Sequence, residues 1–133
     1  MTDVTLKAID DMETLYDGVA RRARAELGVT AWGMQVMTLP PGWEGYPDHD
    51  HGQGTEEAGQ EEVYIPLSGS AALVADGESY NMVPGVMVRV GPHQRRRILP
   101  GPDGIRFVAL GGVVGAHAPS PWTELGGPWP VPT

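Results

Sequence analysis

Turn residues divide most of this chain into short segments, and this spacing limits the folds that are open to it. The 133 residues include 19 glycines and 13 prolines, a content typical of many turns between short strands. Between these breaks, apolar and β-branched residues form extended segments at 30–39, 62–67, 71–75, 78–82, 86–90, 94–99 and 105–110. Short strands at a turn-punctuated spacing of about 8 to 12 residues predict an all-β antiparallel sandwich or barrel.

Three of the breaks predict specific connections. The Ser-Gly-Ser sequence at 68–70 is expected to reverse the chain after 62–67, and Asp76-Gly77 is a strong signal for a type I′ turn. Residues 100–104, rich in glycine and proline, are expected to form a loop. The segments on either side of these turns should pair as antiparallel neighbours.

One helix is expected near the N-terminus, from about residue 10 to residue 28. Asp10 and Glu13 have the spacing of a capping box, and Gly28 is a residue that commonly ends helices. Between them, apolar residues recur every three or four positions, at Met12, Leu15, Val19, Ala23 and Leu27.

Length and composition favour a single soluble domain. A chain of 133 residues can bury a core without disulfides, and no cysteine is present for a disulfide, a thiolate metal site or a nucleophile. No apolar run is long enough to cross a membrane, and the first residues lack a signal-peptide pattern. We therefore expect one cytoplasmic domain over residues 1–133, with the helix followed by a barrel at about 29–112. The Gly/Pro-rich tail at 113–133, with Trp122 and Trp129, is expected to pack over the body as ordered loop.

Charge is distributed unevenly along the chain. The net charge of −8 argues against nucleic acid or an anionic membrane as a partner. Acidic residues crowd between residues 44 and 62, where there is no lysine or arginine, whereas five arginines gather between 89 and 106. Because opposite charges neutralise each other when they meet, the acidic and the basic segment should be neighbours in the fold.

The pair His49-x-His51, followed by Glu62, predicts a metal site. Side chains on an extended segment alternate, so the two imidazoles point to the same side and can share one ion. A carboxylate from Glu62 on the next strand would complete a nitrogen, nitrogen and oxygen set that suits a divalent transition metal. Glu61 has the opposite parity and should point outward, whereas Tyr64 shares the face of Glu62 and should line the cavity. The alternative is two exposed loop histidines beside aspartates.

The same residues resemble the cupin family. The first cupin signature matches His49-x-His51, Glu62 and Gly69, and the second matches Gly77, Pro84-Gly85 and the Gly91-Pro92-His93 region. The resemblance covers residues 42–97. It implies a jelly-roll β-barrel with a metal or substrate site inside its mouth, and it implies a homodimer formed by strand exchange or sheet packing.

Two departures from the cupin pattern bear on the site. The loop at 52–60 is longer than the family's usual gap and could act as a lid. Where cupins commonly place a fourth ligand, a histidine, this chain has Arg96, and His93 comes three residues earlier. His93 is then either the fourth ligand or a residue at the mouth of the barrel. An inward Arg96 would either pair with Glu62, or act with a metal to hold an anionic ligand, and an outward Arg96 would do neither.

The function expected from these residues is that of a small metal-binding cupin. Iron(II), manganese or zinc would bind to His49, His51, Glu62 and His93, with Tyr64 and Arg96 as candidate catalytic residues. The centre would act on or bind a small polar metabolite, possibly carboxylate-bearing, by oxygenase- or isomerase-type chemistry. The main alternative is a metal-free, non-catalytic ligand-binding or sensor cupin with Arg96 in the cavity, and a purely structural barrel is the third.

Overall fold

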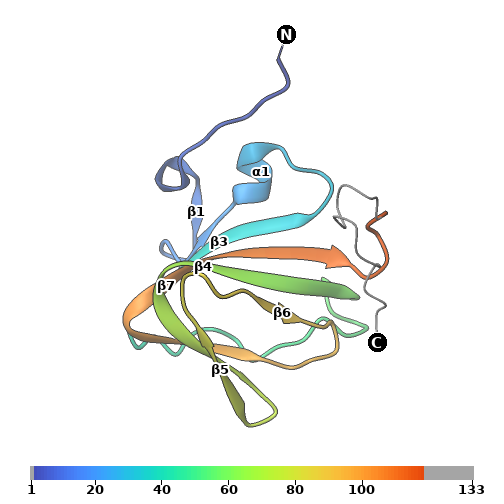
Figure 1. The fold of residues 1–133 in the computed structure, drawn as a ribbon. Coiled ribbons are helices and arrows are strands. Elements are labelled where there is room, and N and C mark those ends of the chain that lie inside the picture. Colours follow the sequence, from blue (N-terminus) through green and yellow to red (C-terminus); the bar gives the residue numbers. More distant parts are fainter. Residues whose placement is uncertain (1, 119–133) are drawn as a thin grey trace.

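The architecture is a curved antiparallel β-sheet with one short α-helix at its edge (Figure 1). A computed structural model describes residues 2–118. Its elements are a 3-10 helix at Ile9–Asp11, β1 at Thr14–Leu15, β2 at Ala20–Arg21, α1 at Ala23–Leu27, β3 at Gly33–Leu39, β4 at Gln60–Ala75, β5 at Glu78–Met82, β6 at Val88–Val90 and β7 at Arg97–Val113. The predicted all-β class with one N-terminal α-helix is confirmed, and the arrangement is consistent with a jelly roll.

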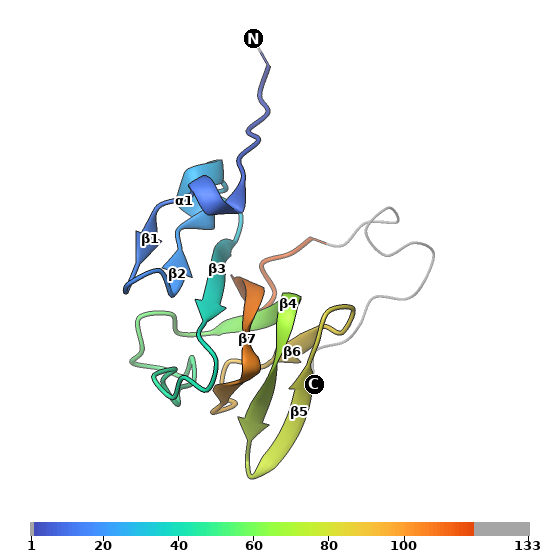
Figure 2. The same cartoon turned by 90° about the vertical axis from the view of Figure 1, so that its left-hand side faces the viewer.

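The sheet is built around two long strands, β4 and β7. Neighbouring strands follow the order β1-β2-β3-β7-β4-β5, and β6 pairs with β4. β4 and β7 pair along most of their length, from Gln60 opposite Val113 to Val74 opposite Arg97. Two register shifts near Pro66 and Gly69 bend the pair. Figures 1 and 2 show the result, with β1 and α1 at one end of the molecule and β5 at the other.

The length of these strands corrects two of the predicted breaks. Residues 68–70 do not reverse the chain but lie inside β4, and residues 100–104 lie inside β7. Gly69 has a φ of +74° and Gly104 a φ of +70°, so each glycine bends its strand without ending it. The Asp76-Gly77 turn is confirmed, because both residues have positive φ, 51° and 76°, and connect β4 to β5.

The predicted helix at 10–28 is wrong over most of its length. Only Ala23–Leu27 is α-helical, and Gly28 ends it in the left-handed conformation, as expected. Residues 16–18 all have positive φ and form the turn between β1 and β2, which adds this hairpin to the edge of β3. Met12 and Ala23 still pack against Val36 in a small core, with Leu27 partly buried against it, whereas Leu15 in β1 is exposed.

The main core lies between the two halves of the bent sheet. Its largest fully buried apolar side chains are Tyr64, Phe107, Leu39, Met82 and Ile98. Tyr64 and Phe107 meet edge to face, with ring centroids 5.5 Å apart. In the part of the chain that the structure describes, no helix is long and apolar enough to cross a membrane.

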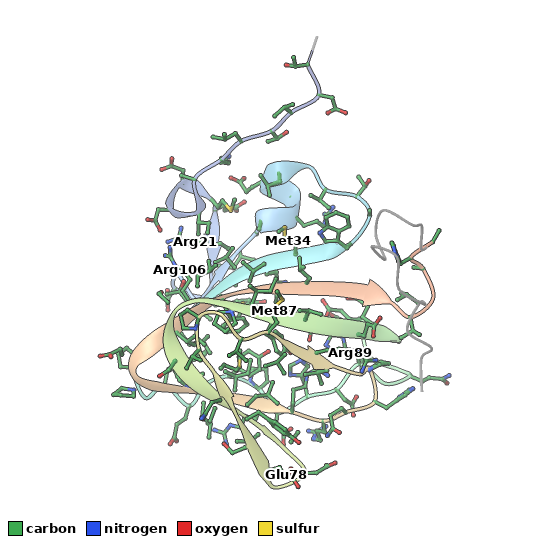
Figure 3. All side chains as sticks on the ribbon, in the orientation of Figure 1. Arg21, Met34, Glu78, Met87, Arg89 and Arg106 are labelled. Atoms are coloured by element: carbon green, nitrogen blue, oxygen red, sulfur yellow. The ribbon has the colours of Figure 1, made fainter. Side chains whose placement is uncertain are left out.

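The acidic and basic segments do meet in the fold. Arg89 pairs with Glu61 at 2.7 Å, Arg95 pairs with Asp48 at 3.3 Å, and Arg96 pairs with Glu62. In the view of Figure 3, Arg89 lies to the right, and Arg21 and Arg106, which both reach Asp10 near the N-terminus, lie to the left. The predicted neighbourhood of the two segments is therefore confirmed, with Arg106 as the exception. The predicted packing of Trp122 and Trp129 lies outside the described residues.

Candidate metal and ligand site

The histidine pair is held in place by backbone hydrogen bonds to the segment before β7. His49 donates its N–H to the carbonyl of Arg96 (3.0 Å), and Arg96 donates its N–H back to the carbonyl of His49 (2.9 Å). The N–H of His51 donates to the carbonyl of Pro92 (2.7 Å). This local β-pairing gives the pair its extended conformation, so both imidazoles point to the same side.

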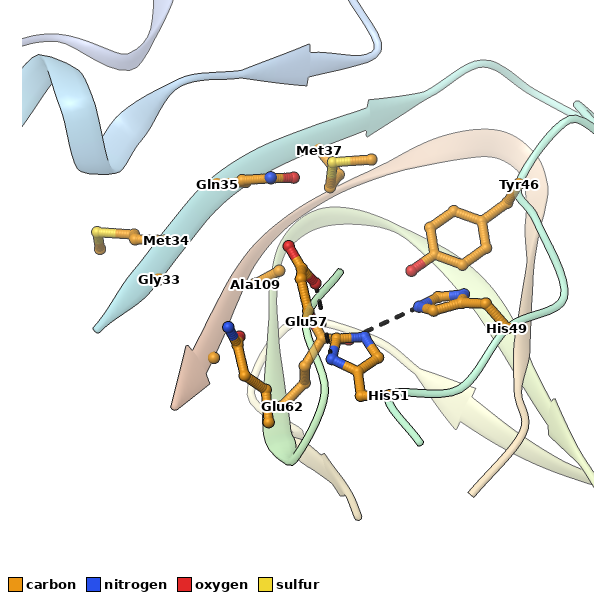
Figure 4. Close-up of a pocket in the computed structure, with 12 residues that line it drawn as sticks. Gly33, Met34, Gln35, Met37, Tyr46, His49, His51, Glu57, Glu62 and Ala109 are labelled. Carbon is orange, nitrogen blue, oxygen red and sulfur yellow. Dashed lines mark ion pairs between the residues drawn. The ribbon is translucent and has the colours of Figure 1, made fainter. Parts of the chain in front are cut away.

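Glu62 reaches the two imidazoles from β4. Its Oε1 atom lies 3.1 Å from Nε2 of His51 and 3.8 Å from Nε2 of His49. One ligand atom from each of the three residues lies within 4.8 Å of the others, and among residues 2–118 this is the group suited to hold a metal ion. Figure 4 shows the three side chains converging at one end of the sheet. The convergence that the sequence predicted for His49, His51 and Glu62 is therefore present.

The hydrogen bond at Nδ1 of His49 sets the tautomer of the ring. It therefore determines whether Nε2, the nitrogen that faces Glu62, carries a lone pair. Its Nδ1 atom lies 3.0 Å from the carbonyl oxygen of Pro47, which can only accept a hydrogen bond. Nδ1 therefore carries the proton, and in the neutral ring Nε2 has a free lone pair. A lone pair and a carboxylate oxygen repel each other unless a cation lies between them. The site thus favours either a proton on Nε2 or a metal ion at that position.

His51 has a similar arrangement, with a carboxylate behind it. The ring is buried, and its Nδ1 atom has no hydrogen-bond partner. Oε2 of Glu57, in the loop at 52–60, lies 3.6 Å from this Nδ1 atom. Metal-bound histidines usually direct their second ring nitrogen toward a carboxylate or a carbonyl. Glu57 and Pro47 occupy those positions here.

Arg96 turns inward and pairs with Glu62. Its guanidinium is fully buried and contacts Oε1 of Glu62, while its Nε donates to the hydroxyl of Tyr64 (3.2 Å) and its Nη1 donates to the carbonyl of Gln94 (3.0 Å). The Tyr64 hydroxyl in turn donates to the same Oε1 atom (2.9 Å). Of the alternatives drawn from the sequence, the structure shows the one in which Arg96 and Glu62 form a pair.

These contacts shift the acid–base behaviour of the site. Burial alone would raise the pKa of Glu62, but the nearby imidazole of His49, the hydrogen bond from Tyr64 and the charge of Arg96 outweigh it and lower that pKa to about 2. The nearby carboxylate of Glu62 raises the pKa of His49, against the opposing effect of burial. Burial raises the pKa of Tyr46 to about 12 and also raises the pKa of Tyr64. Glu62 is therefore ionised and both tyrosines are neutral near pH 7.

A pocket of about 170 Å³ opens beside the three residues. Two glycines from paired strands, Gly33 and Gly111, form part of its wall and leave room for the side chain of Gln60. The remaining lining residues are Met34, Gln35, Met37, Tyr46, His49, His51, Glu57, Glu62 and Ala109. No lysine or arginine is among these described residues. Arg96 lies behind Glu62 and is not part of the pocket wall.

The other site residues predicted from the sequence lie in different places. His93 is exposed on the turn at 91–94, and the structure does not bring it into the group of three. Glu61 points outward to Arg89, as its parity predicted. Sequence reasoning missed Tyr46 and Glu57 as lining residues. Both lie in the connection between β3 and β4, where no periodic pattern shows which way a side chain points.

Comparisons with known proteins found similar solved structures but no match to a protein family or a curated protein by sequence. No protein-family model matches the chain, and no curated protein matches it. Among solved structures, a cupin protein from Bacteroides fragilis is 23% identical, with a TM-score of 0.70, and the match covers 98% of this chain and 100% of that one. A sugar phosphate isomerase from a cupin superfamily of Silicibacter pomeroyi is 20% identical, with a TM-score of 0.64 and coverage of 80% and 74%. A Cupin 2 conserved barrel domain protein from Salinispora arenicola is 20% identical, with a TM-score of 0.53 and coverage of 65% and 67%.

Proposed function

We propose, from the cupin fold that these likenesses show, that the chain binds a divalent metal ion through His49, His51 and Glu62. The observation that carries this proposal is the convergence of two imidazole nitrogens and one carboxylate oxygen. Metal–ligand bonds of about 2.0–2.2 Å place neighbouring ligand atoms roughly 3–4 Å apart. The distances of 3.1 and 3.8 Å from Glu62 to the two Nε2 atoms fit this range. The proton that Pro47 holds on Nδ1 of His49 also leaves the correct nitrogen free.

The pocket beside this centre would hold a small polar molecule. Gln35 and Gln60 offer amides, and Tyr46 offers a hydroxyl that stays protonated near neutral pH. With no lysine or arginine among the described lining residues, recognition by the side chains of Gln35, Gln60 and Tyr46 favours a neutral, hydroxyl-bearing molecule over a phosphate or carboxylate. A bound divalent ion would add Lewis-acid character and open coordination positions.

Isomerisation has stronger support than oxygenation as the reaction class. The Silicibacter pomeroyi neighbour is named as a sugar phosphate isomerase. We take from it the reaction class and not the phosphate, because no lysine or arginine is among the described lining residues of this pocket. Isomerisation beside a carbonyl needs a group that accepts a proton and returns it to the neighbouring carbon. Glu57 supplies a partly exposed carboxylate at the pocket, and Tyr46 supplies a neutral hydroxyl. We therefore propose that Glu57 accepts a proton from one carbon of the ligand and returns it to the neighbouring carbon, and that the Tyr46 hydroxyl donates a hydrogen bond to the ligand oxygen.

A second function, metal-free ligand binding, is favoured by a separate observation. Arg96 already neutralises Glu62, and Tyr64 completes the hydrogen bonding of the same oxygen atom. A buried carboxylate with these partners is satisfied without an added ion. In that case the same pocket would bind a ligand with no metal chemistry.

Metal analysis of protein purified without chelators separates the two functions. The metal-binding proposal expects about one iron, manganese or zinc ion per chain, and a rise in melting temperature when one of these ions is added to the apoprotein. His51→Ala should abolish both effects, whereas His93→Ala, a change at an exposed position, should leave them unaltered. Far less than one ion per chain, with no thermal shift from any of the three metals, would overturn the metal-binding proposal. Loss of metal from His93→Ala would instead add His93 to the ligand set.

A further inference from the structure

Arg96 is fixed at the site by both its backbone and its side chain. The backbone exchanges two hydrogen bonds with His49, and the guanidinium contacts Glu62, Tyr64 and the carbonyl of Gln94. The side chain has no exposed surface. Moving the guanidinium away from Glu62 would therefore bury an unpaired charge or break the pairing with His49.

The same oxygen atom serves the guanidinium and the histidines. Oε1 of Glu62 contacts Arg96, accepts from Tyr64 and faces both Nε2 atoms. A carboxylate oxygen has two lone pairs, and here two donors already occupy them. A divalent ion at Oε1 must displace one of these donors or else use the second oxygen of Glu62. In both cases it would sit close to a guanidinium that stays charged at every accessible pH.

We infer that Arg96 is a built-in competitor for the metal: it holds Glu62 in position and lowers the affinity of the site for a divalent cation. The inference rests on the proposed metal site, but it concerns the strength of binding and not its existence. Arg96 acts through Glu62 and is a positioning residue. Its removal should free the carboxylate and take a positive charge away from the incoming ion, so binding becomes tighter.

The test compares the zinc dissociation constants of the full-length protein and its variants, measured by competition with a chromophoric chelator. Arg96→Gln removes the charge and keeps hydrogen-bonding groups, and Arg96→Met serves the same purpose if the glutamine variant does not fold. Loss of a group that supports a metal ligand commonly weakens metal binding by about 10- to 100-fold. Because Arg96 opposes the ion, we expect its replacement to have the opposite sign and a similar size, with zinc binding about 10- to 100-fold tighter. Arg96→Lys, which keeps the charge, should bind zinc within about threefold of the unchanged protein.

Arg95→Met is the matched control. Arg95 is the neighbouring residue, but its side chain is 60% exposed and pairs with Asp48 outside the site. Its loss should change zinc affinity by no more than about twofold, because exposed ion pairs contribute little.

The outcomes distinguish failure of this inference from failure of the proposed function. If the unchanged protein binds no zinc but Arg96→Gln does, the competition is supported and the metal-binding function is overturned. If both bind with equal affinity, the function is supported and the competition is overturned. If neither binds, both are overturned. A gain in Arg96→Lys as large as that in Arg96→Gln would show that charge is not the cause, which also overturns the competition.

Discussion

Gly69 offers a quantitative test of how the bend in β4 is built. An added Cβ at this glycine would lie 2.1 Å from the carbonyl oxygen of Gly104, 2.9 Å from its carbonyl carbon and 3.1 Å from Cα of Ile105. All three atoms belong to the backbone of β7, so no side-chain rotation can relieve the contact. The φ of +74° is a second obstacle, because left-handed backbone is unfavourable for residues with a Cβ.

The conformational cost and the steric cost of the substitution can be estimated separately. The left-handed conformation costs an alanine about 1–2 kcal/mol, and forcing extra volume into a packed site typically costs about 1–3 kcal/mol more. We therefore expect Gly69→Ala to lower the free energy of unfolding by about 2–5 kcal/mol. Gly77→Ala is the matched control, because Gly77 has a φ of +76° but nothing within 4 Å of an added Cβ. It should lose only about 1–2 kcal/mol.

Urea unfolding followed by tryptophan fluorescence measures both variants against the unchanged protein. The difference between the two losses isolates the steric contact with β7, since the φ values are nearly the same. If Gly69→Ala and Gly77→Ala lose equal stability, the close approach of β4 and β7 at this bend is refuted.

Three further predictions concern the site and the assembly. Tyr64→Phe leaves the Nε of Arg96 and a lone pair of Glu62 without their buried partner, so urea unfolding should show a loss of about 1–3 kcal/mol, and a loss within error would contradict the network. The folded-state pKa of Glu62, about 2, lies below its ordinary value of 4.5, so its contribution to stability is complete above pH 4.5 and is lost as the pH falls toward 2. Glu62→Gln should therefore show a shallower decline of melting temperature across that window, and an unchanged slope would be evidence against the ion pair. Finally, we predict a homodimer: light scattering should give twice the chain mass of 14.2 kDa, and deletion of residues 2–8, where Val4 and Leu6 are 80% and 93% exposed, should shift the mass toward that of one chain. A full-length protein of single-chain mass would contradict it.

The fold was predictable where local sequence and long-range pairing agree. Asp76-Gly77 reverses the chain, and the strand at 105–110 lies within β7. The same reasoning failed at Gly69, because the chain's course there depends on continuous pairing with β7, which no local pattern records. It also failed at residues 10–28, although the Asp17-Gly18 dipeptide was a turn signal within the predicted helix.

Side-chain directions in the site were predictable where residues alternate along extended backbone. Period-two reasoning placed His49 and His51 together and separated Glu62 from Glu61, because each pair lies on extended backbone. The inward direction of Arg96 was one of several alternatives. The choice depends on the free energy of a buried ion pair with Glu62, which cannot be judged from the sequence.

The two backbone hydrogen bonds between His49 and Arg96 have a mechanical consequence for the mouth of the protein. His49, a proposed metal ligand, and Arg96, the cation proposed to oppose the metal, are directly paired residues of two different segments. An entering molecule that pulls His49 outward must either drag the stretch before β7 with it or separate the two segments. The entrance therefore opens either by a joint movement of both segments or by the loss of both hydrogen bonds.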